Sequence, residues 1–185
     1  IVDVWYPGEE GGHAIADVLF GDYNPAGRLP ITFPVHEAQL PLVYNHKPTG
    51  RGDDYNKLSG LPLFPFGYGL SYTSFEYSDI KLSKDKMKDT DTVTVSFKIK
   101  NTGSVDGAEI AEVYVADKES TIFRPKKELR GFKKVFLKAG EEKEVTIELS
   151  KRAFAFYNVN INDWYVESGD FDIIVAASSR DPRLS

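Results

Sequence analysis

The amino-acid sequence predicts a mainly β protein in which a β-sandwich follows a partial α/β-sandwich segment and a long connector. Hydrophobic and polar residues alternate over most of residues 71–185, as in strands with one buried face. Residues 1–34 instead combine a continuous apolar run with a helical stripe. Residues 35–70 show neither period and are rich in Pro, Gly, Asn and Asp. We therefore expect three parts with these boundaries.

The first part has the pattern of the end of an α/β unit. The apolar run from Ile1 to Tyr6 predicts a strand buried on both faces. A helix is expected from Gly12 to Phe20, where the apolar residues form one stripe, and Gly21 suits its C-cap. A short strand is expected from Leu29 to Phe33.

One helix and two strands cannot bury their own apolar faces. We therefore expect exposed apolar side chains wherever a larger neighbouring sheet is lacking. The residues concerned are Trp5, Ile15, Leu19 and Phe20.

The connector, residues 35–70, is unusually long for a stretch without periodicity. Such loops are usually functional or lie on a neighbouring surface. Its aromatic and glycine-rich end, from Leu63 to Leu70, is too apolar to lie free in water. We expect that run to be held against protein.

The third part contains about seven expected strands. Their alternating residues lie at 75–82, 93–99, 111–115, 135–137, 145–149, 154–157 and 171–177. Ala139-Gly140-Glu141 is expected to join the fourth and fifth as a hairpin. Each strand has one apolar face, so two sheets packed face to face bury them economically. An immunoglobulin-like or fibronectin-like sandwich follows.

Composition excludes several classes of function. With 41% hydrophobic residues the chain of 185 residues can bury a core, whereas a net charge of −5 argues against nucleic acid as a partner. The absence of cysteine excludes disulfides and thiolate metal sites. No apolar run approaches the roughly 18 residues of a membrane span, and no signal peptide is visible. The compartment is left open.

Glu9 and Glu10 are the most tempting acidic pair, because they occupy a turn after a predicted buried strand. The plainer interpretation is that they favour the positive end of the helix dipole. Adjacent side chains point apart, so the two carboxylates cannot both face one reacting bond. We assign them no catalytic role.

Other polar residues carry weaker signals. Asp53 and Asp54, beside Arg51, could reach a sugar or a partner domain, but a solvated or interdomain contact explains them equally simply. The histidines at 13, 36 and 46 lack the spacing of a metal pair or a nucleophile–base pair. We expect no metal and no cofactor, since no phosphate-binding glycine loop is present either. A solvated strand face is expected for the basic run Lys126, Lys127, Arg130, Lys133 and Lys134.

The chain resembles the C-terminal portion of glycoside hydrolase family 3. Residues 5–12 (WYPGEEGG), 14–22 (AIADVLFGD) and 24–30 (NPAGRLP) resemble the end of that family's α/β-sandwich domain. Residues 44–51 (YNHKPTGR) and 65–72 (PFGYGLSY) resemble the connector of its β-glucosidase branch. Residues 100–103 (KNTG), 127–132 (KELRGF) and 169–171 (GDF) look like its fibronectin type III-like domain.

The resemblance implies a retaining β-glycosidase for the intact protein, most simply a β-glucosidase acting on a β-glucoside or oligosaccharide. In that family an upstream (β/α)₈ barrel supplies the aspartate nucleophile, and the α/β-sandwich domain supplies the acid/base glutamate upstream of Trp5. Neither motif matches this chain, so the chain alone is expected to be inactive and to support those upstream domains. Its substrate-binding residues are left unassigned.

Three alternatives stay open. The first is a β-xylosidase of the same family. The second is a free sandwich that binds carbohydrate, although Trp164 alone is a weak candidate for a sugar platform. The third is a scaffold for a homodimer.

Overall fold

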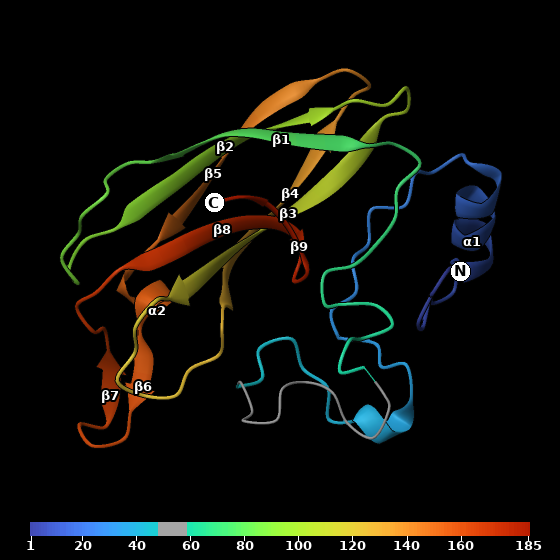
Figure 1. The fold of residues 1–185 in the computed structure, drawn as a ribbon. Coiled ribbons are helices and arrows are strands. Elements are labelled where there is room, and N and C mark those ends of the chain that lie inside the picture. The colour runs from blue at the N-terminus through green and yellow to red at the C-terminus, as the bar shows by residue number, and fades with distance from the viewer. Residues whose placement is uncertain (48–58) are drawn as a thin grey trace.

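The fold is a two-layer antiparallel β-sandwich with a helical segment at its N-terminal side. The computed structural model describes residues 1–47 and 59–185. One sheet has the strand order β1-β2-β5 and the other β4-β3-β8-β9, while β6 and β7 form a separate ribbon (Figure 1). The strands are β1 (Phe75–Leu82), β2 (Val93–Asn101), β3 (Gly107–Asp117), β4 (Glu128–Leu137), β5 (Glu142–Leu149), β6 (Phe156–Asn158), β7 (Asp163–Tyr165), β8 (Phe171–Ser178) and β9 (Asp181–Leu184). The predicted mainly β sandwich is confirmed.

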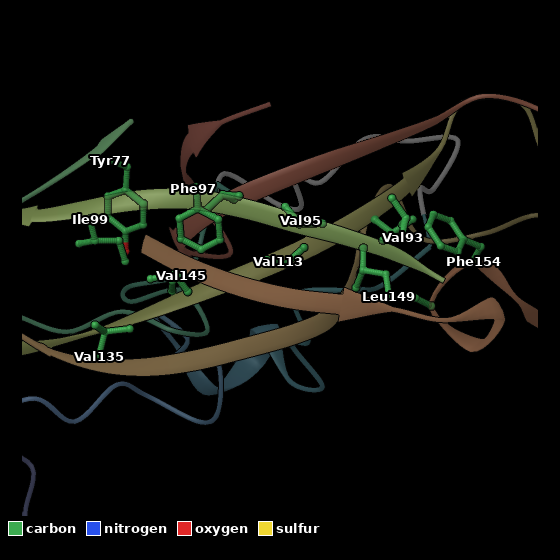
Figure 2. Packing of buried hydrophobic residues seen from close by; sticks show 14 of the residues in the cluster. Tyr77, Val93, Val95, Phe97, Ile99, Val113, Val135, Val145, Leu149 and Phe154 are labelled. Atoms are coloured by element: carbon green, nitrogen blue, oxygen red, sulfur yellow. The ribbon is translucent and has the colours of Figure 1, made fainter. Parts of the chain in front are cut away.

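The core lies between the two sheets and consists of the inward rows that the alternation predicts. On β2, Val93, Val95, Phe97 and Ile99 are almost fully buried. Side chains of β5, from the same sheet, and of β3, β4 and β8, from the opposite sheet, complete the cluster (Figure 2). Each buried apolar side chain of this size contributes about 1.5–3 kcal/mol. This cluster therefore supplies most of the stability of the sandwich.

The predicted hairpin between β4 and β5 is wrong. β4 pairs with β3 and β5 pairs with β2, so the turn at Gly140, where φ is 76°, carries the chain from one sheet to the other. Val135 and Val145 therefore enter the core from opposite sheets. An apolar row of period two is the same in both arrangements, because the pattern shows which face is buried and not which strand is the neighbour.

Residues 1–34 form one helix and no extended strand. Helix α1 (Gly11–Phe20) is confirmed, with Gly21 as a left-handed C-cap at φ 88°. The strand expected from Ile1 to Tyr6 is wrong, because a strand needs a hydrogen-bonded neighbour and none of the described residues pairs with this run. The strand expected from Leu29 to Phe33 is reduced to a single bridge between Phe33 and Phe64.

The apolar side chains of this first segment are exposed, as expected. The exposed fractions are 52% for Trp5, 62% for Leu19 and 84% for Phe20, while Ile15 is half-buried. Figure 1 shows α1 at one side of the sandwich, joined to it through the long connector. The described residues of the connector include a short 3₁₀ helix, η1 (Glu37–Gln39).

The region after β5 differs in detail from the prediction. A strand was expected over residues 154–157, but a short helix, α2 (Lys151–Phe154), ends there and β6 follows it. The prediction also missed β7 and β9. Both are short, and β9 contains Pro182, which an edge strand tolerates because one row of its backbone groups faces away from the sheet.

The three-part division of the chain at residues 34/35 and 70/71 stays a prediction. Within the described ranges, no helix has the length and apolar character needed to cross a lipid bilayer.

Candidate functional site

A buried ion pair joins the N-terminal segment to the sandwich. Arg28 Nη2 lies 2.7 Å from Glu109 Oε2, and the two side chains are only 7% and 4% exposed. Tyr77, from the opposite sheet, donates its hydroxyl to Glu109 Oε1 at 3.1 Å. Burial raises the pKa of Glu109, although the Arg28 charge and the Tyr77 hydroxyl oppose that rise. Both oxygens of the Glu109 carboxylate thus have a partner, and its charge is offset by that of Arg28 in a site with little water.

A second buried carboxylate, Glu112, lies on the same strand but faces the connector. Tyr114 donates its hydroxyl to Glu112 Oε2 at 2.5 Å. Gly67 lies so close that a Cβ there would collide with the carboxylate. Gly67 also has a φ of 81°, in the left-handed region that side chains disfavour. Glycine at this position therefore lets the connector lie directly on Glu112.

The aromatic end of the connector is held against the sandwich, as the sequence predicts. Tyr44 stacks on Phe66 with ring centroids 4.8 Å apart and meets Tyr114 edge-on at 5.7 Å. The backbone N–H of Ser179 donates to Phe66 O at 2.9 Å. Leu63 and Leu70, at the two ends of the run, are exposed. The middle of the run thus makes the contacts.

Asn24 fixes the end of the helical segment to the sandwich loops. Its Nδ2 donates to Asp106 O at 2.9 Å, and its Oδ1 accepts from Ser71 Oγ at 3.0 Å and from Tyr72 N at 2.9 Å. The Tyr72 hydroxyl donates to Val18 O, in α1, at 2.6 Å. These bonds orient α1 relative to the sandwich.

The two buried carboxylates do not form an acid/base pair. Residues three apart on a strand lie on opposite faces of the sheet, and Glu109 reaches the facing sheet while Glu112 reaches the connector. Each accepts a hydrogen bond from a tyrosine of the chain itself. The arrangement is therefore a clamp that fastens the N-terminal segment and the connector to the sandwich rather than a hydrolytic centre.

The Glu112→Gln variant is expected to change how stability depends on pH. Burial raises the pKa of Glu112 above its ordinary value of 4.5, so the folded chain binds the proton more tightly than the unfolded chain. The contribution of Glu112 to stability is then present below that value and is lost as pH rises through the raised pKa. Chemical denaturation at a series of pH values should show the variant gaining stability relative to the parent as pH rises. A constant difference across that range would contradict the assignment.

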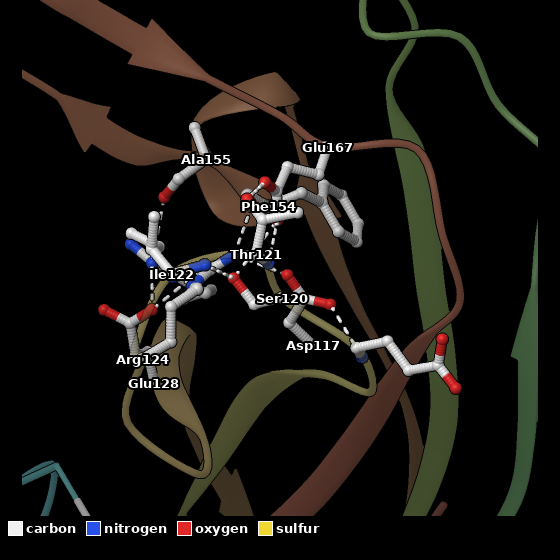
Figure 3. A network of polar contacts seen from close by, with 11 residues as sticks. Asp117, Ser120, Thr121, Ile122, Arg124, Glu128, Phe154, Ala155 and Glu167 are labelled. Carbon is white, nitrogen blue, oxygen red and sulfur yellow. Dashed lines mark hydrogen bonds and ion pairs between the residues drawn. The ribbon is translucent and has the colours of Figure 1, made fainter. Parts of the chain in front are cut away.

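A second polar cluster connects the end of β3, the start of β4 and α2 (Figure 3). Arg124 pairs with Asp117 at 2.9 Å and with Glu128 at 3.0 Å, and Arg130 pairs with the same Glu128 oxygen at 2.7 Å. Arg124 also donates to the backbone oxygen of Phe154, in α2. All of its acceptors belong to the chain, so this cluster attaches the α2–β6 segment to the sandwich.

The acidic and histidine candidates of the sequence lie apart from this clamp. Glu9 and Glu10 are exposed, and Glu10 Oε2 lies 2.6 Å from His13 Nδ1. His36 accepts from Ala38 N at the start of η1. His46 Nδ1 lies 3.1 Å from Lys47 O. Within residues 1–47 and 59–185, no group of three or more His, Cys, Asp or Glu side chains is placed to hold a metal.

The loop residues and the basic run were the other candidates from the sequence. Arg51, Asp53 and Asp54 lie outside the described residues. The solvated face expected for the basic run is wrong at Lys127, which is half-buried with its Nζ 4.9 Å from the centre of the Tyr114 ring. It is also wrong at Arg130, which is held in the ion pair described above.

Sequence reasoning missed Arg28 and Glu109 as a functional pair, although one signal was present. Glu109 falls on the inward row of Ala111 and Val113, where a carboxylate is costly unless it is paired. That position therefore requires a buried cation, but the pattern does not show which of the distant arginines supplies it.

Fold and clamp together define a class of protein: a fibronectin-like sandwich module fastened to an N-terminal helical segment that exposes apolar side chains. Residues 1–72 match the family described as "Glycosyl hydrolase family 3 C-terminal domain", and residues 109–179 match the "Fibronectin type III-like domain". The chain belongs to glycoside hydrolase family 3, of which it carries these two parts.

Individual relatives are similar to nearly the whole of this chain. Thermostable β-glucosidase B of Acetivibrio thermocellus is 48% identical over 98% of this chain and 25% of its own length. A putative β-xylosidase of Formosa agariphila is 38% identical over 98% of this chain and 24% of its own. The solved structure of a β-glucosidase from Erythrobacter marinus superimposes with a TM-score of 0.93 at 40% identity, covering 99% of this chain and 24% of that one. The chain spans about a quarter of the length of the relatives it matches.

Proposed function

We propose that this chain is the C-terminal, structural part of a retaining β-glucosidase that releases terminal non-reducing β-D-glucosyl residues. Its function is to complete the α/β-sandwich domain and to hold that domain against the fibronectin-like sandwich. The upstream barrel and α/β domain of the same enzyme are its partners and carry the catalytic carboxylates. β-Glucosidases among the similar proteins, at up to 48% identity, support this proposal.

One observation carries the structural role. The segment that bears the exposed Trp5, Leu19 and Phe20 is also fixed to the sandwich through the buried Arg28–Glu109 pair. An exposed apolar surface on a rigidly held element is typical of a face that another domain covers. The chain therefore joins a neighbouring domain on one side to the sandwich on the other.

The purified chain is expected to show no hydrolysis of an aryl β-glucoside, because Glu109 and Glu112 lie on opposite faces of β3 and are already engaged. Fusion to the upstream region of the Acetivibrio thermocellus relative, in place of its own last quarter, should restore activity. The matched control is that upstream region without the chain. Release of the aryl group by the chain alone would refute the proposal.

The β-xylosidase alternative concerns substrate rather than mechanism. One relative is a putative β-xylosidase, so the intact polypeptide should be compared on aryl β-glucoside and aryl β-xyloside. A higher kcat/KM for the glucoside supports the proposal, and a higher one for the xyloside replaces it with the alternative.

A carbohydrate-binding module is less well supported. Trp164 and Tyr157 form a cross-strand pair on the β6–β7 ribbon, but their rings meet at an interplanar angle of 68° and do not form a flat platform. Arg152 also lies over the ring of Trp164. The homodimer scaffold stays a proposal, tested by sedimentation of the intact enzyme with and without residues 71–185.

A further inference from the structure

A cleft of about 340 Å³ lies between the connector and the sandwich. The connector side is formed by residues on both flanks of Tyr44 and by Pro62 and Pro65. The sandwich side is formed by the approach to β4 and by the β8–β9 turn, with Lys126, Lys127 and Arg180. The clamp described above lies beneath this cleft, because Tyr44 rests on Phe66 and Tyr114.

The cleft carries unbalanced positive charge. Lys126, Lys127 and Arg180 line it, and no Asp or Glu of the described ranges does. None of the three cations forms an ion pair with a described residue, whereas the more buried Arg28, Arg124 and Arg130 are each paired. The chain as a whole has a net charge of −5. A local excess of positive charge in a concave part of an acidic protein attracts anions.

The ammonium group of Lys127 is only partly solvated. Its Nζ lies 4.9 Å from the centre of the Tyr114 ring, and the side chain is half-buried. Burial and then the neighbouring Arg180 lower the pKa of Lys127, and the charge of Glu112, the smallest of the three effects, opposes them. Glu112 is already bound by the Tyr114 hydroxyl. A bound anion would relieve the repulsion between Lys127 and Arg180.

The cleft has a volume that suits a charged small molecule larger than a single ion. Its volume is about ten times the roughly 30 Å³ that one water occupies, which places it among small-ligand sites rather than single-ion sites. Tyr44, Pro62, Pro65 and Pro182 are the ring-bearing residues of its lining, and Thr32 also lines it. Apolar rings suit the non-polar face of a pyranose, while Arg180 can bind a carboxylate through two N–H groups.

We propose that this cleft binds a sugar acid, with the carboxylate on Lys127 and Arg180 and the pyranose ring against Tyr44 and the prolines. This proposal does not depend on the proposed β-glucosidase activity. A uronic acid, free or at the end of an oligosaccharide, is the ligand class that meets both requirements.

Titration of the full chain with D-glucuronate, D-glucose and inorganic phosphate, followed by calorimetry or by NMR, tests the site. Glucuronate is expected to bind about tenfold or more tightly than glucose, since a charge-assisted hydrogen bond is lost with the neutral sugar. Phosphate is expected to bind more weakly than glucuronate. Equal affinity for glucose, or tighter binding of phosphate, would overturn the assignment of a sugar acid.

Two variants locate the binding. Arg180→Glu changes an exposed side chain in the cleft, and we expect it to weaken glucuronate binding about tenfold or more. Lys133→Glu makes the same change of charge at an exposed position on β4 outside the cleft, and we expect it to leave binding within about twofold. Thermal unfolding confirms that both variants fold. Equal loss in both variants, or no loss with Arg180→Glu, would contradict the site.

Discussion

Replacing Arg28 by methionine is expected to lower the free energy of unfolding by about 3–5 kcal/mol, because it leaves a buried carboxylate without its cation. Glu109 is 4% exposed and would keep only the Tyr77 hydroxyl. Methionine fills the space of the arginine stem beside Gly69, which lies against that side chain. The loss therefore reports the missing charge rather than a cavity.

The same variant makes a second prediction about pH. Burial already raises the pKa of Glu109, and removal of Arg28, which lowers it, should raise it further. The folded variant then holds its proton over a wider range than the unfolded chain. The difference in stability from the parent should thus be small below the ordinary pKa of 4.5 and should grow as pH rises.

A double-mutant cycle supplies the control. Glu109→Gln alone leaves a buried guanidinium, whereas Arg28→Met combined with Glu109→Gln removes both charges and should recover a large part of the loss. Chemical denaturation of the four proteins at neutral pH measures the coupling. Additive single effects would show that Arg28 and Glu109 contribute independently and that the clamp is not a charge pair.

The sandwich was predictable because each of its main strands has one apolar face. Val93, Val95, Phe97 and Ile99 alternate without interruption, and all four enter the core. Helix α1 was equally clear, since its stripe ends at Gly21, which takes the left-handed conformation at φ 88°. In both cases a short stretch of sequence is enough, because burial of one strand face and termination of a helix depend on residues that are close together in the chain.

The predictions that were wrong or missing depend on residues distant in the sequence, which a local pattern does not specify. The row containing Val135 and Val145 fits a hairpin and a crossing between sheets equally well, and hydrogen bonding to β3 and β2 decides between them. The run from Ile1 to Tyr6 has strand composition but no paired strand among the described residues. The Arg28–Glu109 pair joins residues 81 positions apart, which no spacing rule connects.

The KNTG string at residues 100–103 could be recognised from the sequence, but its physical purpose is visible only in the structure. Asn101 is fully buried at the end of β2. Its Nδ2 donates to Val105 O at 2.8 Å and to Leu137 O at 3.2 Å. Its Oδ1 accepts from Thr73 Oγ1 at 2.5 Å and from Gly103 N at 3.1 Å. One amide thus joins both sheets to Thr73, in the segment that leads into β1.

Asn101→Leu is expected to destabilise the chain by about 3–5 kcal/mol. The substitution keeps a similar volume but leaves two carbonyl oxygens, one hydroxyl and one N–H without partners, and each such buried group costs about 1–3 kcal/mol before the loop relaxes. Asn101→Asp keeps the acceptor for Thr73 and Gly103 but places negative charge against Leu137 O, so it should be destabilised as well.

Thr102→Ala is the matched control in the same string. Thr102 is exposed, and its Oγ1 makes a single bond of 3.2 Å to Ser74 O, so its loss should cost no more than about 1 kcal/mol. Urea denaturation of the three variants, with the slope compared to the parent, measures the difference. If Asn101→Leu cost no more than Thr102→Ala, the Asn101 amide would not be what holds the two sheets and the segment of Thr73 together, because its four bonds would then be replaceable by water.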